Sequence, residues 1–177
     1  MLVAKQVADL ITFSRGMLAF FLAWLGATQG EDGLPTVVWA MIINWTGDSV
    51  DGALARHSQR QYRTWIGDHD LQIDMLVSLG LLMYMLLAGY VNPINTVIYF
   101  LIWVGIFWRW GVAPALGMLF QAPIYGWFIW VANRELFTTG IWLVVWIITA
   151  VVLTWPKFPK VVIPGFLAGI RQVHGKK

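Results

Sequence analysis

The chain alternates between long apolar runs and short polar segments. Polar residues interrupt it at 29–33 and 133–135, and no charged side chain occurs in 75–108. A single crossing needs about 20 residues, so 75–108 is too long for one helix, and the Asn-Pro-Ile-Asn sequence at 92–95 divides it. The apolar runs predict helices at 10–28, 34–47, 70–89, 96–110, 111–131 and 137–155, with the second continuing through 48–56. We therefore expect an all-α integral membrane bundle of six transmembrane helices in a single domain over residues 1–177.

The amino-acid composition also indicates an integral membrane protein. The chain is 59% hydrophobic and 12% charged, with a mean hydropathy of +0.68, which is typical of integral membrane proteins. It contains no cysteine, which excludes a disulfide framework, thiolate chemistry and a zinc–thiolate site. The net charge of +3 is small, and the expected partners are membrane lipids rather than nucleic acid.

The positive charges predict the orientation. With six spans and the N-terminus inside, eleven of the 12 Lys and Arg residues fall on the inner side, and Arg134 falls outside. The positive-inside rule therefore favours an N-in, C-in topology. We expect a basic tail after 157 that touches anionic headgroups, and we expect the protein in a plasma membrane, the inner membrane of a prokaryotic cell.

Five of the nine acids lie between residues 46 and 74. Asp48 and Asp51 are three residues apart and Asp70 and Asp74 are four apart, so each pair shares a helix face. Carboxylates beside long apolar runs are costly and tend to be functional. Four facing carboxylates repel one another unless cations lie between them, and magnesium favours such oxygen ligands. The spacing therefore predicts a divalent-metal site at the cytoplasmic interface. Asp68, the fifth acid, is interpreted as a solvated loop charge.

The segment resembles the signature of the CDP-alcohol phosphotransferase family. That signature runs Asp, two residues, Asp-Gly, two residues, Ala-Arg, a spacer, Gly, three residues, Asp, three residues, Asp. Its matches here are Asp48, Asp51, Gly52, Ala55, Arg56, Asp70 and Asp74. Two positions depart from it: Gly67 precedes Asp70 by three residues instead of four, and Met75 stands where many members carry Lys.

The resemblance implies transfer of a substituted phosphoryl group from a CDP-linked lipid, such as CDP-diacylglycerol, to a small alcohol, with release of CMP. It implies that two Mg²⁺ or Mn²⁺ ions are held by Asp48, Asp51 and Asp70 with Asp74 close by, and that Asp74 is the catalytic base. It also implies that Gly52, Ala55, Arg56 and Gly67 contact the donor nucleotide or its phosphates.

Two further arginines are candidate acceptor-binding residues. Residues 8–16 resemble an Asn-Leu-x-Thr-x-x-Arg segment common in the family, with Asp9 in place of Asn, which places Arg15 near the site. Arg109, at a helix junction, is the second candidate for an acceptor phosphate. The alternatives are that Arg15 reaches lipid headgroups and that Arg109 only sets the topology.

The sequence does not decide which alcohol is the acceptor. Glycerol 3-phosphate is our expectation, and inositol phosphate and serine are alternatives. A metal-dependent CDP-lipid hydrolase and a scaffold that has lost catalysis are competing functions. An aspartate-lined channel would place acids deep within the spans, and none is found there. The resemblance also makes a homodimer a possible assembly.

Overall fold

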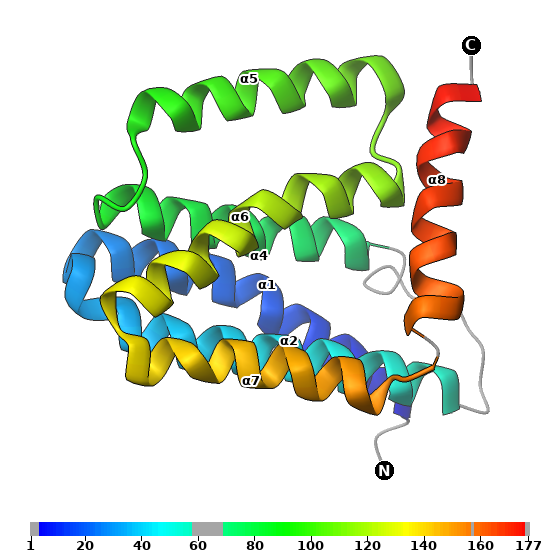
Figure 1. Ribbon diagram of the computed structural model, residues 1–177, viewed down its shortest axis with the longest axis horizontal. Coiled ribbons are helices and arrows are strands. Elements are labelled where there is room, and N and C mark those ends of the chain that lie inside the picture. Colours follow the sequence, from blue (N-terminus) through cyan, green and yellow to red (C-terminus); the bar gives the residue numbers. More distant parts are fainter. Residues whose placement is uncertain (1–3, 58–68, 157, 176–177) are drawn as a thin grey trace. The chain divides into compact units, whose positions relative to one another are not determined.

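The computed structural model describes residues 4–57, 69–156 and 158–175, and at 4–8, 51–57, 158, 162 and 172–175 it describes the backbone alone. Throughout this described part the regular secondary structure is helical, without strands, so the all-α prediction is confirmed (Figure 1). In chain order the elements are α1 (Ala4–Gln29), η1 (Gly30–Gly33), α2 (Leu34–His57), α4 (Asp70–Leu87), α5 (Pro93–Trp110), α6 (Pro114–Glu135), α7 (Phe137–Leu153), η2 (Phe158–Val162) and α8 (Ile163–Gly175).

Each of the six predicted spans corresponds to a helix, and the ends differ where capping residues act. Helix α5 begins at Pro93 rather than at 96, because the Asn92 side chain accepts a hydrogen bond from the Ile94 N–H at 2.8 Å and Pro93 suits the first helical position. Gly111 ends α5 with a φ of 74°, a conformation that glycine adopts without strain. Helix α6 therefore begins at Pro114, three residues later than predicted.

The segment after 157, expected only as a basic tail, folds into η2 and α8. Helix α8 packs against α6, and a Cβ at Gly169 would lie 3.0 Å from the Cβ of Ala115. The hydropathy pattern missed this helix because its 13 residues mix apolar side chains with glycine and basic residues.

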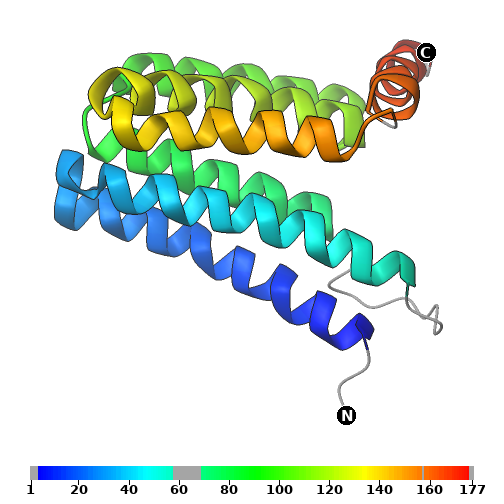
Figure 2. The ribbon, with the colours of Figure 1, turned by 60° about the horizontal axis from the view of Figure 1, so that its bottom comes forward.

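The helices form two compact units, residues 1–90 and 91–177, and each is described by itself. Unit 1 contains α1, η1, α2 and α4. Helix α2 runs back along α1 after the η1 turn, and α4 also packs against α1 (Figure 2). At the far end of α4, the Tyr84 hydroxyl donates a hydrogen bond to the Gly30 carbonyl at 3.1 Å, which ties α4 to η1. The single-domain expectation over 1–177 stays a prediction.

Glycines bring α1 and α4 into backbone contact. A Cβ at Gly80 would lie 2.6 Å from the Ala19 Cα, and one at Gly26 would lie 2.9 Å from the Tyr84 Cα. Small residues allow this close approach, as they do between membrane helices. The contact fixes the separation of the two helices along most of α4.

Unit 2 contains α5 to α8. Helices α6 and α7 pack as an antiparallel pair, and Gly140 lies directly against the backbone of Ala132 and Asn133. Helix α5 meets α6 through aromatic rings: the ring centroids of Trp103 and Phe120 are 5.5 Å apart, and the Tyr99 hydroxyl donates to the Phe120 carbonyl.

Helix α1 has two distinct faces. Its inward face carries buried side chains, Thr12, Arg15, Ala19, Leu22 and Leu25, and its outward face carries exposed apolar ones, Leu10, Phe13, Met17, Phe20 and Trp24. Both sets recur at the three- and four-residue spacing of one helical face. Large apolar side chains that stay exposed favour contact with lipid or another protein over contact with water.

Three helical segments are long and apolar enough, by length and composition, to cross a membrane: 9–50, 70–87 and 114–135. The first includes the η1 turn and so contains most of α1 and most of α2. Phe137–Leu153 is a shorter apolar helix.

Candidate functional site

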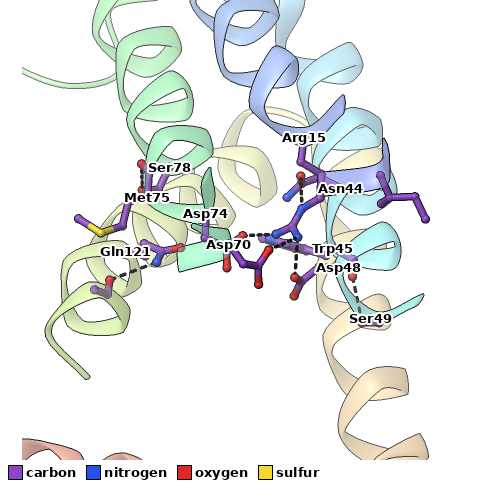
Figure 3. A network of polar contacts seen from close by, with 12 residues as sticks. Arg15, Asn44, Trp45, Asp48, Ser49, Asp70, Asp74, Met75, Ser78 and Gln121 are labelled. Atoms are coloured by element: carbon purple, nitrogen blue, oxygen red, sulfur yellow. Dashed lines mark hydrogen bonds and ion pairs between the residues drawn. The ribbon is translucent and has the colours of Figure 1, made fainter. Parts of the chain in front are cut away.

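The site forms around one arginine in the interior of α1. The side chain of Arg15 is only 6% exposed, although it belongs to a long and mostly apolar helix. A buried guanidinium is costly unless acceptors surround it. Figure 3 shows these acceptors converging on Arg15 from two other helices.

Helix α2 supplies Asn44 and Asp48, which lie one turn apart on the same face. The Arg15 Nε donates to the Asn44 Oδ1 at 3.4 Å, and the Arg15 Nη1 lies 2.8 Å from the Asp48 Oδ1. Asn44 is itself buried, at 4% exposure. The two α2 residues therefore hold one edge of the guanidinium.

Helix α4 supplies Asp70 and Asp74, at its first residue and one turn further on. The Arg15 Nη1 lies 3.5 Å from the Asp70 Oδ1, and the Arg15 Nη2 makes a close ion pair with the Asp74 Oδ1. The partial positive charge at the N-terminus of α4 also stabilises the Asp70 carboxylate. Arg15 thus connects α1, α2 and α4 at one end of unit 1.

The three carboxylates are close enough together to share a cation. One oxygen from each of Asp48, Asp70 and Asp74 lies within 4.8 Å of the others. A magnesium ion binds oxygens at about 2.0–2.1 Å, which places its ligands roughly 3–4 Å apart. The donor set is all oxygen, as Mg²⁺ and Mn²⁺ prefer, so the residues fit a divalent ion after a small contraction.

The charge of the cluster also favours a cation. Three carboxylates and one guanidinium leave a formal charge of −2 on these four side chains. The side chains of Asp48 and Asp70 are 46% and 47% exposed, and that of Asp74 is 25% exposed. The carboxylates therefore face an accessible side of unit 1, whereas Arg15 approaches them from the interior.

The structure thus brings together four of the residues singled out from sequence: Arg15, Asp48, Asp70 and Asp74. The backbone of α2 extends through Asp51, Gly52, Ala55 and Arg56, but their side chains lie outside the described residues, as do Gly67 and Asp68 entirely. Their assigned roles stay predictions.

Arg109 belongs to unit 2, in the last turn of α5. It is exposed, and its guanidinium carbon lies 5.5 Å from the centre of the Trp110 ring. Its role in binding an acceptor stays a prediction.

Sequence reasoning missed Asn44. Its position one turn before Asp48 on a predicted helix was the available signal. A lone polar residue within an apolar span is also a familiar sign of helix-to-helix hydrogen bonding.

A cavity of about 630 Å³ lies between α1 and α2, beside Arg15. Apolar side chains form most of its wall, among them Ile11, Leu18 and Ile43. Its two hydroxyl side chains, Ser14 and Thr46, donate to backbone carbonyls of their own helices, which leaves few polar groups to bind a polar ligand. The cavity therefore suits an apolar chain that ends near the carboxylates.

The chain matches no protein-family model, no curated protein and no solved structure. The resemblance to the CDP-alcohol phosphotransferases thus depends on the motif residues themselves.

Proposed function

We propose that this protein is a membrane-embedded, divalent-metal-dependent transferase of the CDP-alcohol phosphotransferase type. It would move a substituted phosphoryl group from a CDP-linked lipid to a small alcohol and release CMP. In this proposal six helices cross the membrane, both termini are cytoplasmic, and the carboxylates lie at the cytoplasmic interface of a plasma membrane, the inner membrane in a prokaryote.

One observation carries the proposal. Asp48 comes from the first half of the motif, and Asp70 and Asp74 come from the second half, yet their oxygens lie within 4.8 Å of one another. A shared site is what the family motif requires of these residues. If these three aspartates were ordinary solvated charges, nothing would require their side chains to lie together.

The chain's residues then have distinct tasks. Asp48, Asp51 and Asp70, with Asp74, would hold two Mg²⁺ or Mn²⁺ ions, which supply neutralisation of the donor pyrophosphate and of the developing charge on oxygen. Asp74 accepts the proton of the acceptor hydroxyl. The acceptor oxygen forms a bond to the lipid-linked phosphorus, the bond from that phosphorus to the CMP oxygen breaks, and CMP leaves with the electron pair.

The apolar surroundings support a lipid donor. The cavity beside Arg15 accommodates an apolar chain, and it reaches the same guanidinium that contacts the three carboxylates. A donor that is part lipid and part nucleotide needs such a junction of apolar and charged surfaces. Gly52, Ala55, Arg56 and Gly67 are the proposed contacts for its nucleotide and phosphates.

The proposed acceptor is glycerol 3-phosphate, because an arginine suits a phosphorylated alcohol, and Arg15 and Arg109 are the separate candidates for that contact. Inositol phosphate and serine are the alternatives. A homodimer is part of the proposal only by analogy with the family.

The test is CMP release by purified protein in detergent with CDP-diacylglycerol, Mg²⁺ or Mn²⁺ and one alcohol at a time. We expect release that requires both the metal and one acceptor. Metal-dependent release without any acceptor would instead identify a CDP-lipid hydrolase. If folded protein releases no CMP with any acceptor, the proposed donor is wrong.

The ion pairs themselves favour a second candidate, a non-catalytic membrane scaffold. Arg15 contacts all three carboxylates, and such a network could serve only to tie α1, α2 and α4 together. A scaffold would release no CMP and would bind neither divalent metal nor the donor. Metal binding by the purified protein separates the two functions independently of turnover.

Narrowing the cavity is expected to weaken the binding of a long-chain donor. Ala40 lines the cavity two helical turns before Asp48, so Ala40→Leu adds volume away from the carboxylates. Excluding roughly two methylenes at about 0.8 kcal/mol each raises KM about tenfold. The measurement is KM for CDP-lipids with long and with short acyl chains, with little change expected for the short ones.

The matched control is Ala27→Leu, the same substitution at an exposed position of α1 outside the cavity lining. It should leave both KM values unchanged. Equal KM increases for long and short donors in Ala40→Leu would mean that the cavity does not hold the acyl chain.

A further inference from the structure

Arg15 contacts the same three carboxylates that are close enough together to share a cation. Its Nη1 lies 2.8 Å from the Asp48 Oδ1 and 3.5 Å from the Asp70 Oδ1, and its Nη2 pairs with the Asp74 Oδ1. A single positive group is thus shared among three carboxylates from two helices. Within the described residues these three carboxylates are also the group close enough together to share an ion.

The arrangement has two electrostatic consequences. Without Arg15, three carboxylates within 4.8 Å would repel one another strongly. A divalent ion held by the same three carboxylates would share its ligands with the guanidinium, and these two like charges would repel each other. The guanidinium and the ion therefore compete for the three carboxylates.

Arg15 can shift away from the carboxylates without entering the apolar part of the neighbouring cavity, because the Asn44 Oδ1 stays within its reach and Asp48 and Asp70 are nearly half exposed. Arg15 lines both the carboxylate cluster and the adjoining cavity of about 630 Å³. Its long side chain can turn about several bonds without moving the helix, while the buried Asn44 Oδ1, at 3.4 Å from Nε, marks the side from which it would pivot.

We infer that Arg15 is an exchangeable counter-ion. It assembles Asp48, Asp70 and Asp74 in the metal-free protein and releases their oxygens to the incoming divalent ion. Arg15 is thus a positioning residue whose ion pairs oppose metal binding. This inference rests on the proposed function, because it requires that the cluster binds a divalent ion.

The test is Mn²⁺ affinity, measured from the electron paramagnetic resonance signal of free Mn²⁺ with purified protein in a neutral detergent without phospholipid. Arg15→Gln removes the competing charge and makes the cluster more negative. We expect Arg15→Gln to bind Mn²⁺ about tenfold more tightly than the wild type, which corresponds to about 1.4 kcal/mol. The matched control is Arg134→Gln, which removes an exposed arginine paired with Glu135 in unit 2 and should leave the affinity unchanged.

Thermal unfolding gives a second readout. Metal-free Arg15→Gln should unfold at a lower temperature than the wild type, because its carboxylates lack their counter-charge, and saturating Mn²⁺ should reduce this difference. Should Arg15→Gln fail to fold without metal, Arg15→Lys provides the comparison. Lysine keeps the charge but not the planar fork that reaches several oxygens, so its Mn²⁺ affinity should lie between those of the wild type and Arg15→Gln.

The inference is overturned if Arg15→Gln, or Arg15→Lys where the former cannot be measured, binds Mn²⁺ no more tightly than the wild type. It is also overturned if no variant binds Mn²⁺. The proposed function fails separately, through the absence of CMP release by the wild type. Metal-dependent CMP release together with weaker Mn²⁺ binding by Arg15→Gln would keep the transferase and reject the exchange.

Discussion

Asp74→Asn is expected to reduce CMP release by about 10²–10⁴-fold, the range that a general base contributes. Asparagine keeps the size of the side chain but cannot accept the proton of the acceptor hydroxyl. Asp74 is the least exposed of the three clustered carboxylates, at 25%, and it pairs closely with Arg15. The measurement is the initial rate of CMP release with saturating donor, acceptor and metal.

Asp32→Asn is the control for this substitution. Asp32 lies in η1, near the end of α4 that Tyr84 ties to Gly30, whereas Asp74 lies near the other end of α4. Asp32→Asn should release CMP at the rate of the wild type. Because Asp74→Asn also removes an ion pair, its thermal unfolding is measured alongside. Near-wild-type turnover by folded Asp74→Asn would remove Asp74 from the role of base.

Gly80→Ala is expected to destabilise the protein more than Gly16→Ala, which adds a methyl group to the same pair of helices. The new Cβ would lie 2.6 Å from the Ala19 Cα, and backbone atoms cannot move aside as a side-chain end can. Overpacking of this kind costs about 1–3 kcal/mol, and alanine's better helix propensity returns up to about 1 kcal/mol. We expect a melting temperature several degrees lower in detergent and weaker Mn²⁺ binding.

Gly16→Ala is the matched control in the same pair of helices. A Cβ at Gly16 would lie 3.9 Å from the Ile73 Cγ2, an ordinary contact. Alanine should therefore be neutral or slightly stabilising there, since it is the better helix former. If both variants melt alike, backbone contact at Gly80 does not set the spacing of α1 and α4.

The helices were predictable because long apolar runs and their polar breaks are properties of the sequence alone. The first and last residues of these helices were less predictable. The Asn-Pro-Ile-Asn sequence at 92–95 predicts a break between helices, and the structure adds that Asn92 caps α5 and Pro93 is its first residue. Helix α8 was missed because a short helix of mixed composition gives no clear hydropathy signal.

Part of the cluster was predictable from spacing. The pairs Asp48–Asp51 and Asp70–Asp74 each indicated a shared face, and the family signature indicated that the two faces meet. That Asp48, Asp70 and Asp74 converge is a finding of the structure.

The position of Arg15 was not predictable from spacing. Whether a basic residue in an apolar helix turns outward to headgroups or inward to carboxylates depends on the rotation of that helix about its axis. That rotation is set by packing, here by glycine contacts such as Gly80 on Ala19. The spacing of Asn44 from Asp48 indicates a shared helix face, but its contact with Arg15 depends on the same packing.

The two faces of α1 imply very different freedom for its sequence to change over evolution. Any apolar side chain of suitable length can replace Leu10, Met17 or Phe20, because their exposed positions require hydrophobicity and not shape. On the inward face, Arg15 must reach three carboxylates and Ala19 must admit a neighbouring backbone. Related sequences would then differ most at the outward positions of α1. They would remain recognisable by the few inward positions, because the rest of the helix requires only apolar side chains.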